Sequence, residues 1–374
     1  MKKSTILFIG ILIIALHALI LYAIIGLKNK EEESAPLSNP YSAYLPKERT
    51  EEPPDEGDGT LVEPLWDTID PQELDPPSPA PAPSVESIAV PTNRSGYLRS
   101  DRPDNHTTQV HSELIGNPYQ SAIVVDVRTG KILYENKATG YAYPASITKL
   151  MTLLLVLEQI DNGKIHLDDK VAITKEVSEI GGSEVYLDAR ESGFYTVDNL
   201  LQALMIHSAN DAARALALHV AGSRDTFVAM MNRRAEELGM NSTTYHSEHG
   251  LPPSDGTQPD ISTPYDIALL CLAVMRHPKT LELSSTKLAW LPQSPIRSEE
   301  FMLANRNILV RQEPYPGCDG LKTGYHAKGG YSLAATAKKG EQRILAVIVG
   351  SPDSKTRTAE VRKLLDIGFE RMTQ

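Results

Sequence analysis

Ser146 and Lys149 form an S-x-x-K motif at the predicted start of an apolar helix. Because three residues make almost one helical turn, the hydroxyl and the amine would lie on one face, within reach of each other. An ordinary serine hydroxyl is a weak nucleophile, and a lysine amine with its ordinary pKa is protonated at pH 7. Burial beside a second cation would lower the pKa of Lys149 and let it accept the serine proton. Taken alone, the motif is more readily explained by an N-cap serine followed by a surface lysine.

Two further triplets carry polar groups that such a pair would need. The S-A-N triplet at 208–210 interrupts an apolar helical pattern with two side chains that prefer caps and turns. The K-T-G triplet at 322–324 comes just before a predicted strand, where Thr323 offers a hydroxyl and Gly324 lets a ligand approach the backbone. Each triplet is weak evidence by itself, but the three motifs in this order and at these separations form a specific pattern.

The elements that must bring these motifs together begin near residue 113. Strands are predicted at 121–127 and 131–136 around a Gly-containing turn, and at 331–340 and 342–350 near the end of the chain. Helices are predicted at 146–160, 197–222, 225–239, 263–277 and 358–372. Strands at both ends that enclose a block of helices indicate an α+β domain over residues 113–374.

The composition excludes several classes of protein. The chain has 374 residues, enough for one large or two ordinary domains. Its two cysteines exclude a disulfide-framework miniprotein, and its net charge of −11 argues against nucleic acid as a partner. A zinc site would need more cysteines and histidines at metal-ligand spacing, so we expect no metal and no other cofactor.

The segment 31–112 differs from the rest of the chain. It holds 14 of the 26 prolines and has 17 acidic against five basic residues. Such a segment has too few apolar residues to offset the entropy of an ordered chain. We therefore expect a disordered, acidic linker.

The segment 6–27 contains 22 residues without a formal charge. This length suffices for a transmembrane helix, and the flanking lysines favour a single span with the N-terminus inside. We expect residues 1–30 to form a membrane anchor, and a cleaved signal peptide is the alternative. Both interpretations place the globular domain outside the cytoplasm.

The three motifs match the signature of active-site serine β-lactamases and penicillin-binding proteins, and their surroundings make the match more specific. Residues 115–372 resemble the D-alanyl-D-alanine carboxypeptidase family, the low-molecular-mass penicillin-binding proteins. The resemblance is carried by PASITKLMT, ALMIHSANDAARALALHVAGS, DGLKTGYHAKGGYSLAATA, MNRRAEELGMNSTTY, HGL, STPYDIALL and RTAEVRKLLDIGF. It implies a β-lactamase/transpeptidase-like fold, in which a five-stranded antiparallel sheet with flanking helices packs against a helical subdomain.

The resemblance also implies roles for the residues of the motifs. Ser146 would be the acylated nucleophile, and Lys149 its general base. Ser208 and Asn210 would complete the proton network and hold the substrate amide. Lys322 would polarise this network and add the cation that lowers the pKa of Lys149.

Other residues would bind the substrate, again by resemblance. The backbone N–H groups of Ser146 and Tyr325 would form an oxyanion hole beside Gly324. Thr323 and Arg357 would bind the terminal carboxylate, for which a planar guanidinium is well suited. The alternative for Arg357 is an ordinary surface arginine.

The chain departs from the family pattern at several positions. His326 stands where the family usually has threonine, and Gly329-Gly330 where it often has Ala-Gly, which we expect to alter the rim of the site. Ala209 replaces the usual glycine of the S-x-N triplet. The chain ends soon after Phe369, so we expect no C-terminal β-rich domain, and the N-terminal anchor would replace the amphipathic anchor helix of many relatives.

Three weaker signals remain. His246 and His249 resemble a metal pair, but no third ligand is evident, and the resemblance assigns them to a loop. Cys271 lies in an apolar helix and Cys318 lies close to Lys322. Whether the two cysteines pair cannot be decided without a distance between them.

The resemblance implies a serine carboxypeptidase that removes the terminal D-alanine from peptidoglycan stem peptides and is covalently inhibited by β-lactams. A peptidoglycan D,D-endopeptidase is one alternative, and a non-catalytic wall-binding or β-lactam-sensing module is another. β-Lactamase activity is disfavoured, because class A enzymes use S-D-N and a glutamate for deacylation where this chain has S-A-N.

Overall fold

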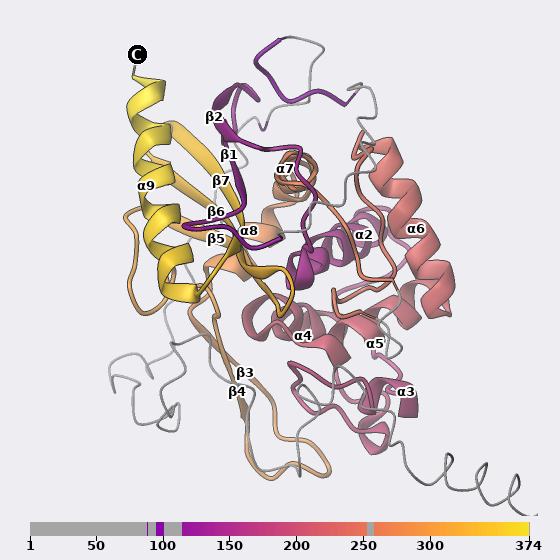
Figure 1. Cartoon of the computed structure of the whole chain (residues 1–374). Coiled ribbons are helices and arrows are strands. Elements are labelled where there is room, and N and C mark those ends of the chain that lie inside the picture. The colour runs from indigo at the N-terminus through magenta and orange to yellow at the C-terminus, as the bar shows by residue number, and fades with distance from the viewer. Residues whose placement is uncertain (1–87, 89–94, 101–113, 253–257, 374) are drawn as a thin grey trace, which may run out of the picture. The chain divides into compact units, whose positions relative to one another are not determined.

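The computed structural model describes residues 88, 95–100, 114–252 and 258–373 (Figure 1). These residues belong to one compact unit, Lys47–Gln374. The predicted transmembrane helix at 6–27 and most of the predicted linker at 31–112 lie outside the described residues. None of the helices within the described residues has the length and apolar character needed to cross a bilayer.

A five-stranded antiparallel sheet forms the centre of the domain, with strand order β2-β1-β7-β6-β5. This arrangement confirms the predicted α+β fold. Its strands are β1 Ser121–Asp126, β2 Ile132–Asn136, β5 Cys318–His326, β6 Gly330–Lys339 and β7 Gln342–Ser351. The first two and the last two of these were predicted, whereas β5 was not. The K-T-G triplet therefore lies inside a strand and not before one.

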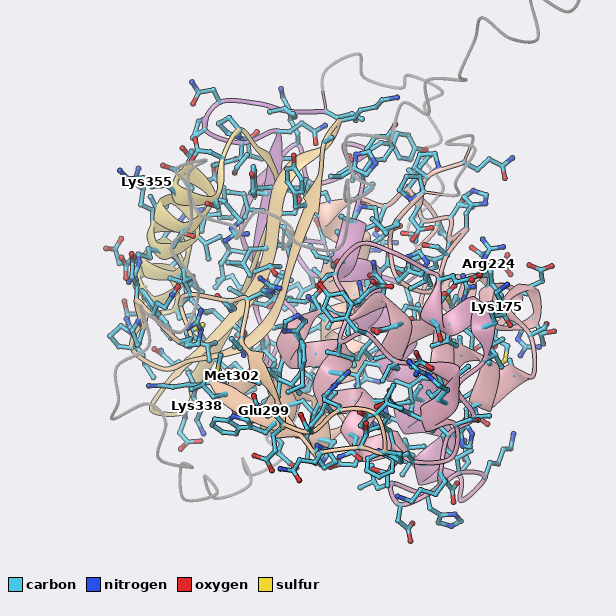
Figure 2. The ribbon with its side chains drawn as sticks, turned by 90° about the horizontal axis from the view of Figure 1, so that it is seen from below. Lys175, Arg224, Glu299, Met302, Lys338 and Lys355 are labelled. Atoms are coloured by element: carbon cyan, nitrogen blue, oxygen red, sulfur yellow. The ribbon has the colours of Figure 1, made fainter. Side chains whose placement is uncertain are left out.

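The two faces of the sheet are covered by different helices. Odd-numbered residues 345–349 of β7 join the core of the helical subdomain, whereas even-numbered residues 344–348 pack under α9 Ser354–Met372. This alternation follows from the pleat of a strand, whose successive side chains point to opposite faces. Figure 1 shows α9 along one face of the sheet and α2 and α7 on the other. In Figure 2, Lys355 of α9 lies across the sheet from Lys175 and Arg224.

The helical subdomain contains most of the predicted helices. Its α-helices are α2 Lys149–Asp161, α3 Lys175–Ser178, α4 Val197–Gln202, α5 Asn210–Ala221, α6 Arg224–Glu237, α7 Pro264–Met275 and α8 Pro278–Ser285. The short helices are η3 Ala145–Thr148, η4 Ala189–Glu191 and the π-helix η5 Ala203–His207. A two-stranded sheet of β3 Leu288–Leu291 and β4 Phe301–Ala304, like α8, was not predicted.

Two predicted helices are interrupted where the motifs lie. The single helix predicted at 197–222 is divided into α4, η5 and α5. The division occurs because Ser208 adopts the left-handed conformation, with φ of 67°, and ends the π-helix. The prediction at 146–160 begins too early, because Ser146 lies in the η3 turn and α2 starts at Lys149. Such irregular backbone is common at functional sites.

Candidate active site

The turn η3 places Ser146 directly before the first residue of a buried helix. Ser146 is partly exposed, whereas Lys149 is 0% exposed. The two side chains meet, with Lys149 Nζ 3.0 Å from Ser146 Oγ. No side-chain cap is formed at either η3 or α2. The alternative of an N-cap serine beside a surface lysine is therefore wrong.

The Lys149 amine has two further partners, and both are neutral oxygens. It lies 2.7 Å from Asn210 Oδ1 and 2.8 Å from the backbone oxygen of His249. With the Ser146 hydroxyl, these groups complete the hydrogen bonding of a buried amine without bringing a carboxylate into contact with it. The structure thus brings the motif residues Lys149 and Asn210 into contact, whereas the His249 carbonyl was not predicted.

The electrostatic surroundings lower the pKa of Lys149 well below its ordinary value. Burial is the main cause, because it removes water from the charged form, and the positive charge of Lys322 acts in the same direction. Three buried carboxyl groups, Glu248, Asp211 and Asp260, oppose the shift without reversing it. This shift favours the uncharged amine, which is the form that can accept a proton.

Lys322 reaches the site from β5. It is 1% exposed, and its Nζ donates to Ser208 Oγ at 2.8 Å. The left-handed backbone at Ser208 turns this residue out of the helical path. The structure thus brings together two residues that lie 114 positions apart in the chain.

Asn210 opens α5 and is held by a loop that the motifs did not reveal. Its Nδ2 donates to the Gly181 carbonyl at 2.8 Å, and its backbone N–H donates to the Ser183 carbonyl at 2.7 Å. A Cβ on Gly182 would come within 2.5 Å of Asn210 Nδ2. The loop 181–183 therefore orients the Asn210 amide so that its oxygen faces Lys149. The G-G-S sequence of this loop was its only sequence signal.

Gly324 lies where β5 meets the nucleophile turn. A Cβ built on it would lie 2.7 Å from the Pro144 carbonyl oxygen and 3.5 Å from the Ala145 Cβ. The side of Gly324 that a Cβ would occupy is thus filled by the chain itself. This contact brings the backbone of the neighbouring Tyr325 alongside the Ser146 turn. The Tyr325 side chain is 42% exposed, and its ring centroid is 4.5 Å from that of Tyr331.

Thr323 lies on the face of β5 opposite to Lys322, and Arg357 belongs to α9, the helix that covers this face of the sheet. Thr323 pairs with Leu333, which belongs to the core under α9, so its side chain points to the α9 face. Arg357 lies in the first turn of α9 and is 1% exposed. The alternative of a surface arginine is therefore wrong.

His326 and Gly329 form a packed unit with Tyr143. The ring centroids of His326 and Tyr143 are 4.5 Å apart, and a Cβ on Gly329 would lie 3.0 Å from the Tyr143 Cβ. Burial lowers the pKa of His326 to about 4, and Lys328 adds to the shift. His326 is therefore neutral at pH 7, and its Nδ1 accepts the Lys328 backbone N–H. Two of the departures from the family pattern thus brace the segment that precedes Ser146.

The weaker signals are also located. His249 Nδ1 accepts a hydrogen bond from the Leu251 backbone N–H. Within the part of the chain that the structure describes, no three side chains of the metal-binding types lie close enough together to hold a metal ion. Cys271 in α7 and Cys318 in β5 are both free thiols, which settles the question of their pairing.

Comparison with known proteins gives a consistent result. The family model for Peptidase S11, D-alanyl-D-alanine carboxypeptidase, matches residues 108–353. D-alanyl-D-alanine carboxypeptidase DacF of Bacillus subtilis is 36% identical over 250 residues, which are 67% of this chain and 62% of that protein. DacC of Escherichia coli is 35% identical over 252 residues, 66% of this chain and 60% of that protein. The chain therefore spans less than two thirds of the length of these curated relatives.

Solved structures of related proteins are similar as well. Penicillin-binding protein D2 of Listeria monocytogenes, in its ampicillin-bound form, has a TM-score of 0.59 and 31% identity, covering 67% of this chain and 97% of that one. Penicillin-binding protein 5 of Haemophilus influenzae has a TM-score of 0.62 and 30% identity, covering 68% and 71%.

Proposed function

Because the chain belongs to the S11 family of D-alanyl-D-alanine carboxypeptidases, the low-molecular-mass penicillin-binding proteins, we propose that it is a serine-type D-Ala-D-Ala carboxypeptidase. Its substrate would be the stem peptide of peptidoglycan, from which it removes the terminal D-alanine. One observation carries the proposal: the completely buried Lys149 amine lies 3.0 Å from the Ser146 hydroxyl. An exposed lysine would be protonated at pH 7 and could not act as a base.

The first half-reaction joins the peptide to Ser146. Neutral Lys149 accepts the hydroxyl proton while Ser146 Oγ attacks the carbonyl carbon of the penultimate D-alanine. The backbone N–H groups of Ser146 and Tyr325 stabilise the negative charge that develops on the carbonyl oxygen. The tetrahedral adduct then collapses by breaking its C–N bond, which leaves an ester on Ser146 and releases D-alanine.

The leaving nitrogen needs a proton, and we assign its delivery to Ser208. The Ser208 hydroxyl gives its proton to the amine and recovers the one that Lys149 took from the nucleophile. Lys322, which donates to Ser208 Oγ at 2.8 Å, stabilises the negative charge on that oxygen during the transfer. Asn210, held by the loop 181–183, keeps Lys149 in place and binds the substrate amide.

The second half-reaction releases the shortened peptide. A water molecule attacks the ester carbonyl, and Lys149 accepts its proton as it did that of Ser146. The Ser146–carbonyl bond breaks, and the serine oxygen takes up the proton that Lys149 accepted from the water. Thr323 of β5 and Arg357 of α9 would recognise the terminal carboxylate of the substrate before acylation.

β-Lactams would react with the same serine. Penicillin-binding protein D2 of Listeria monocytogenes has been solved in ampicillin-bound and cefotaxime-bound forms. We propose that β-lactams also bind to this chain, at Ser146. The S-A-N triplet differs from the S-D-N triplet of class A β-lactamases, which supports slow hydrolysis of the penicilloyl ester.

We also propose that the domain acts outside the cytoplasm, tethered to a bacterial membrane through the segment 6–27. The uncharged 22-residue stretch and the lysines around it support this location. Protease treatment of intact cells or spheroplasts tests it, because an outward domain is digested while a cytoplasmic marker survives. Survival of the domain under these conditions would contradict the proposal.

The activity is tested with the full chain and a pentapeptide that ends in D-Ala-D-Ala. We expect D-alanine release from the wild-type chain and none from Ser146→Ala. Fluorescent penicillin should label the first and not the second. A folded wild-type chain that releases no D-alanine would refute the carboxypeptidase assignment, and cleavage of crosslinked dimers in preference to pentapeptides would favour an endopeptidase.

A further inference from the structure

The loop 246–250 lies directly behind the nucleophile turn, although it belongs to none of the three motifs. Its His249 carbonyl accepts from Lys149 Nζ at 2.8 Å, and its Glu248 carbonyl accepts from Thr152 Oγ1 at 2.5 Å. Gly250 packs so closely on the Ala145 carbonyl that a Cβ there would overlap it. The position of the catalytic amine therefore depends on the position of this loop.

A single buried carboxylate joins the loop to the nucleophile turn. Asp260 is 2% exposed, and its Oδ1 accepts the backbone N–H groups of His246 at 2.6 Å and Ser247 at 2.9 Å. Its Oδ2 accepts the hydroxyls of Ser247 at 3.1 Å and Thr148 at 2.8 Å. Thr148 is the last residue of η3, directly before Lys149. Each carboxylate oxygen thus accepts two hydrogen bonds, and Oδ2 links the loop 246–250 to the η3 turn.

The ionised form of Asp260 suits this arrangement. All four partners are donors, which is what an acceptor-only carboxylate requires. Burial raises the pKa of Asp260 to about 6, against the opposing effect of these hydrogen bonds. The carboxylate is therefore still mostly ionised at pH 7.

We propose that Asp260 is a positioning residue for the acylation centre, because it fixes the loop 246–250 against the turn that carries Ser146 and thereby holds the His249 carbonyl on Lys149. Asp260 touches neither Ser146 nor Lys149 and acts through Thr148 and Ser247. The inference rests on the proposed function, since it concerns the step in which Ser146 is acylated.

Replacement of Asp260 by alanine and by asparagine separates this role from simple packing. Asp260→Ala leaves two backbone N–H groups and two hydroxyls of the link without an acceptor. Asp260→Asn can still accept the N–H groups with its oxygen, while its NH2 group donates to hydroxyls that reverse their direction. We expect the alanine variant to acylate about 10²-fold more slowly, as for a catalytic group displaced by about 1 Å, and the asparagine variant to recover most of the loss.

The measurement is the acylation of the full chain by fluorescent penicillin, resolved into non-covalent affinity and the acylation rate constant, and normalised to folded protein. The loss should appear in the rate constant with little change in affinity. Asp266→Asn is the matched control: Asp266 is also a buried carboxylate, 4% exposed, but its partners Ser242 and Thr243 lie outside the loop 246–250. We expect this variant to acylate like the wild type.

Thr148→Val provides a second test should Asp260→Ala fail to fold. It removes only the hydroxyl that links Asp260 to η3, and we expect it to slow acylation several-fold with unchanged affinity. Wild-type rates in Asp260→Ala, or in Thr148→Val, would overturn the inference while leaving the proposed function intact. A wild-type chain that does not react with penicillin at all would overturn both.

Discussion

Replacement of Gly324 by alanine tests how closely the sheet must approach the nucleophile turn. In this variant the new Cβ would lie 2.7 Å from the Pro144 carbonyl oxygen and 3.3 Å from Ile147 Cγ1. The first neighbour is backbone and cannot rotate away. To reach an ordinary contact of 3.4 Å, β5 and the η3 turn must separate by roughly 0.7 Å.

The expected cost follows from the residues on either side of this contact. The proposed oxyanion donors are the backbone N–H groups of Tyr325, next to Gly324, and Ser146, which follows Ala145. Separation of the two segments moves one donor away from the other. Because a displacement of about 1 Å costs about 10²-fold in rate, a separation of roughly 0.7 Å should slow acylation by at least about 10-fold, which is about 1.4 kcal/mol in the barrier.

The assay is the second-order rate constant for acylation by fluorescent penicillin, with thermal unfolding measured in parallel. Gly340→Ala is the matched control. Gly340 has φ of 59° in the turn between β6 and β7, and a Cβ there meets nothing within 4 Å. That variant should lose about 1 kcal/mol of stability from its left-handed backbone and acylate normally. Wild-type acylation by Gly324→Ala at an unchanged melting temperature would refute the reasoning.

Three further predictions concern charge near the site. Lys322→Met removes the positive charge that helps to lower the pKa of Lys149, so the acid limb of the pH–acylation profile should move to higher pH. Asn210→Asp places a carboxylate where Lys149 now meets an amide oxygen at 2.7 Å, which should raise the pKa of Lys149 and move the same limb in the same direction. His326 has a folded-state pKa of about 4 against an ordinary value of 6.5, so it favours folding above pH 6.5, and this stability is lost as the pH falls towards 4. His326→Phe abolishes this titration, so between pH 6.5 and pH 4 the free energy of unfolding should fall by on the order of 3 kcal/mol less than in the wild type. Chemical denaturation at several pH values measures this difference, and a pH dependence equal to that of the wild type would contradict the prediction.

Local sequence patterns predicted those elements whose identity depends on near neighbours. The continuous apolar run at 344–349 in β7 and the apolar face of α9 are visible in the sequence, and the structure confirms both elements. The strand β5 is different, because residues 320–324 are buried on both faces and include two glycines and a lysine, which leaves no alternation to recognise. The break in the predicted helix at 197–222 depends on the left-handed backbone at Ser208, which a periodic pattern does not reveal.

The same distinction applies to the site. The motif side chains Ser146, Lys149, Asn210 and Lys322 could be predicted, because the reaction requires their chemical groups. The His249 carbonyl and the loop 181–183 could not be, because every residue carries a backbone carbonyl and its use depends on the fold. Their role appears only when distances between remote segments are known, such as the 100 positions that separate Lys149 from His249.

The arrangement of charge around Lys149 explains why a lysine can serve as a base here. The three nearby carboxylates would each raise its pKa on direct contact, but each is bound by other donors. Asp260 accepts hydrogen bonds from hydroxyls and backbone N–H groups, and Asp211 accepts them from the backbone N–H groups of residues 185 and 187. Glu248 Oε1 accepts a hydrogen bond from Arg214 Nε at 2.6 Å. These bonds stabilise buried negative charge without using the Lys149 amine. The acids can therefore hold the surrounding loops in place, while neutral oxygens alone contact the amine and leave it free to accept a proton.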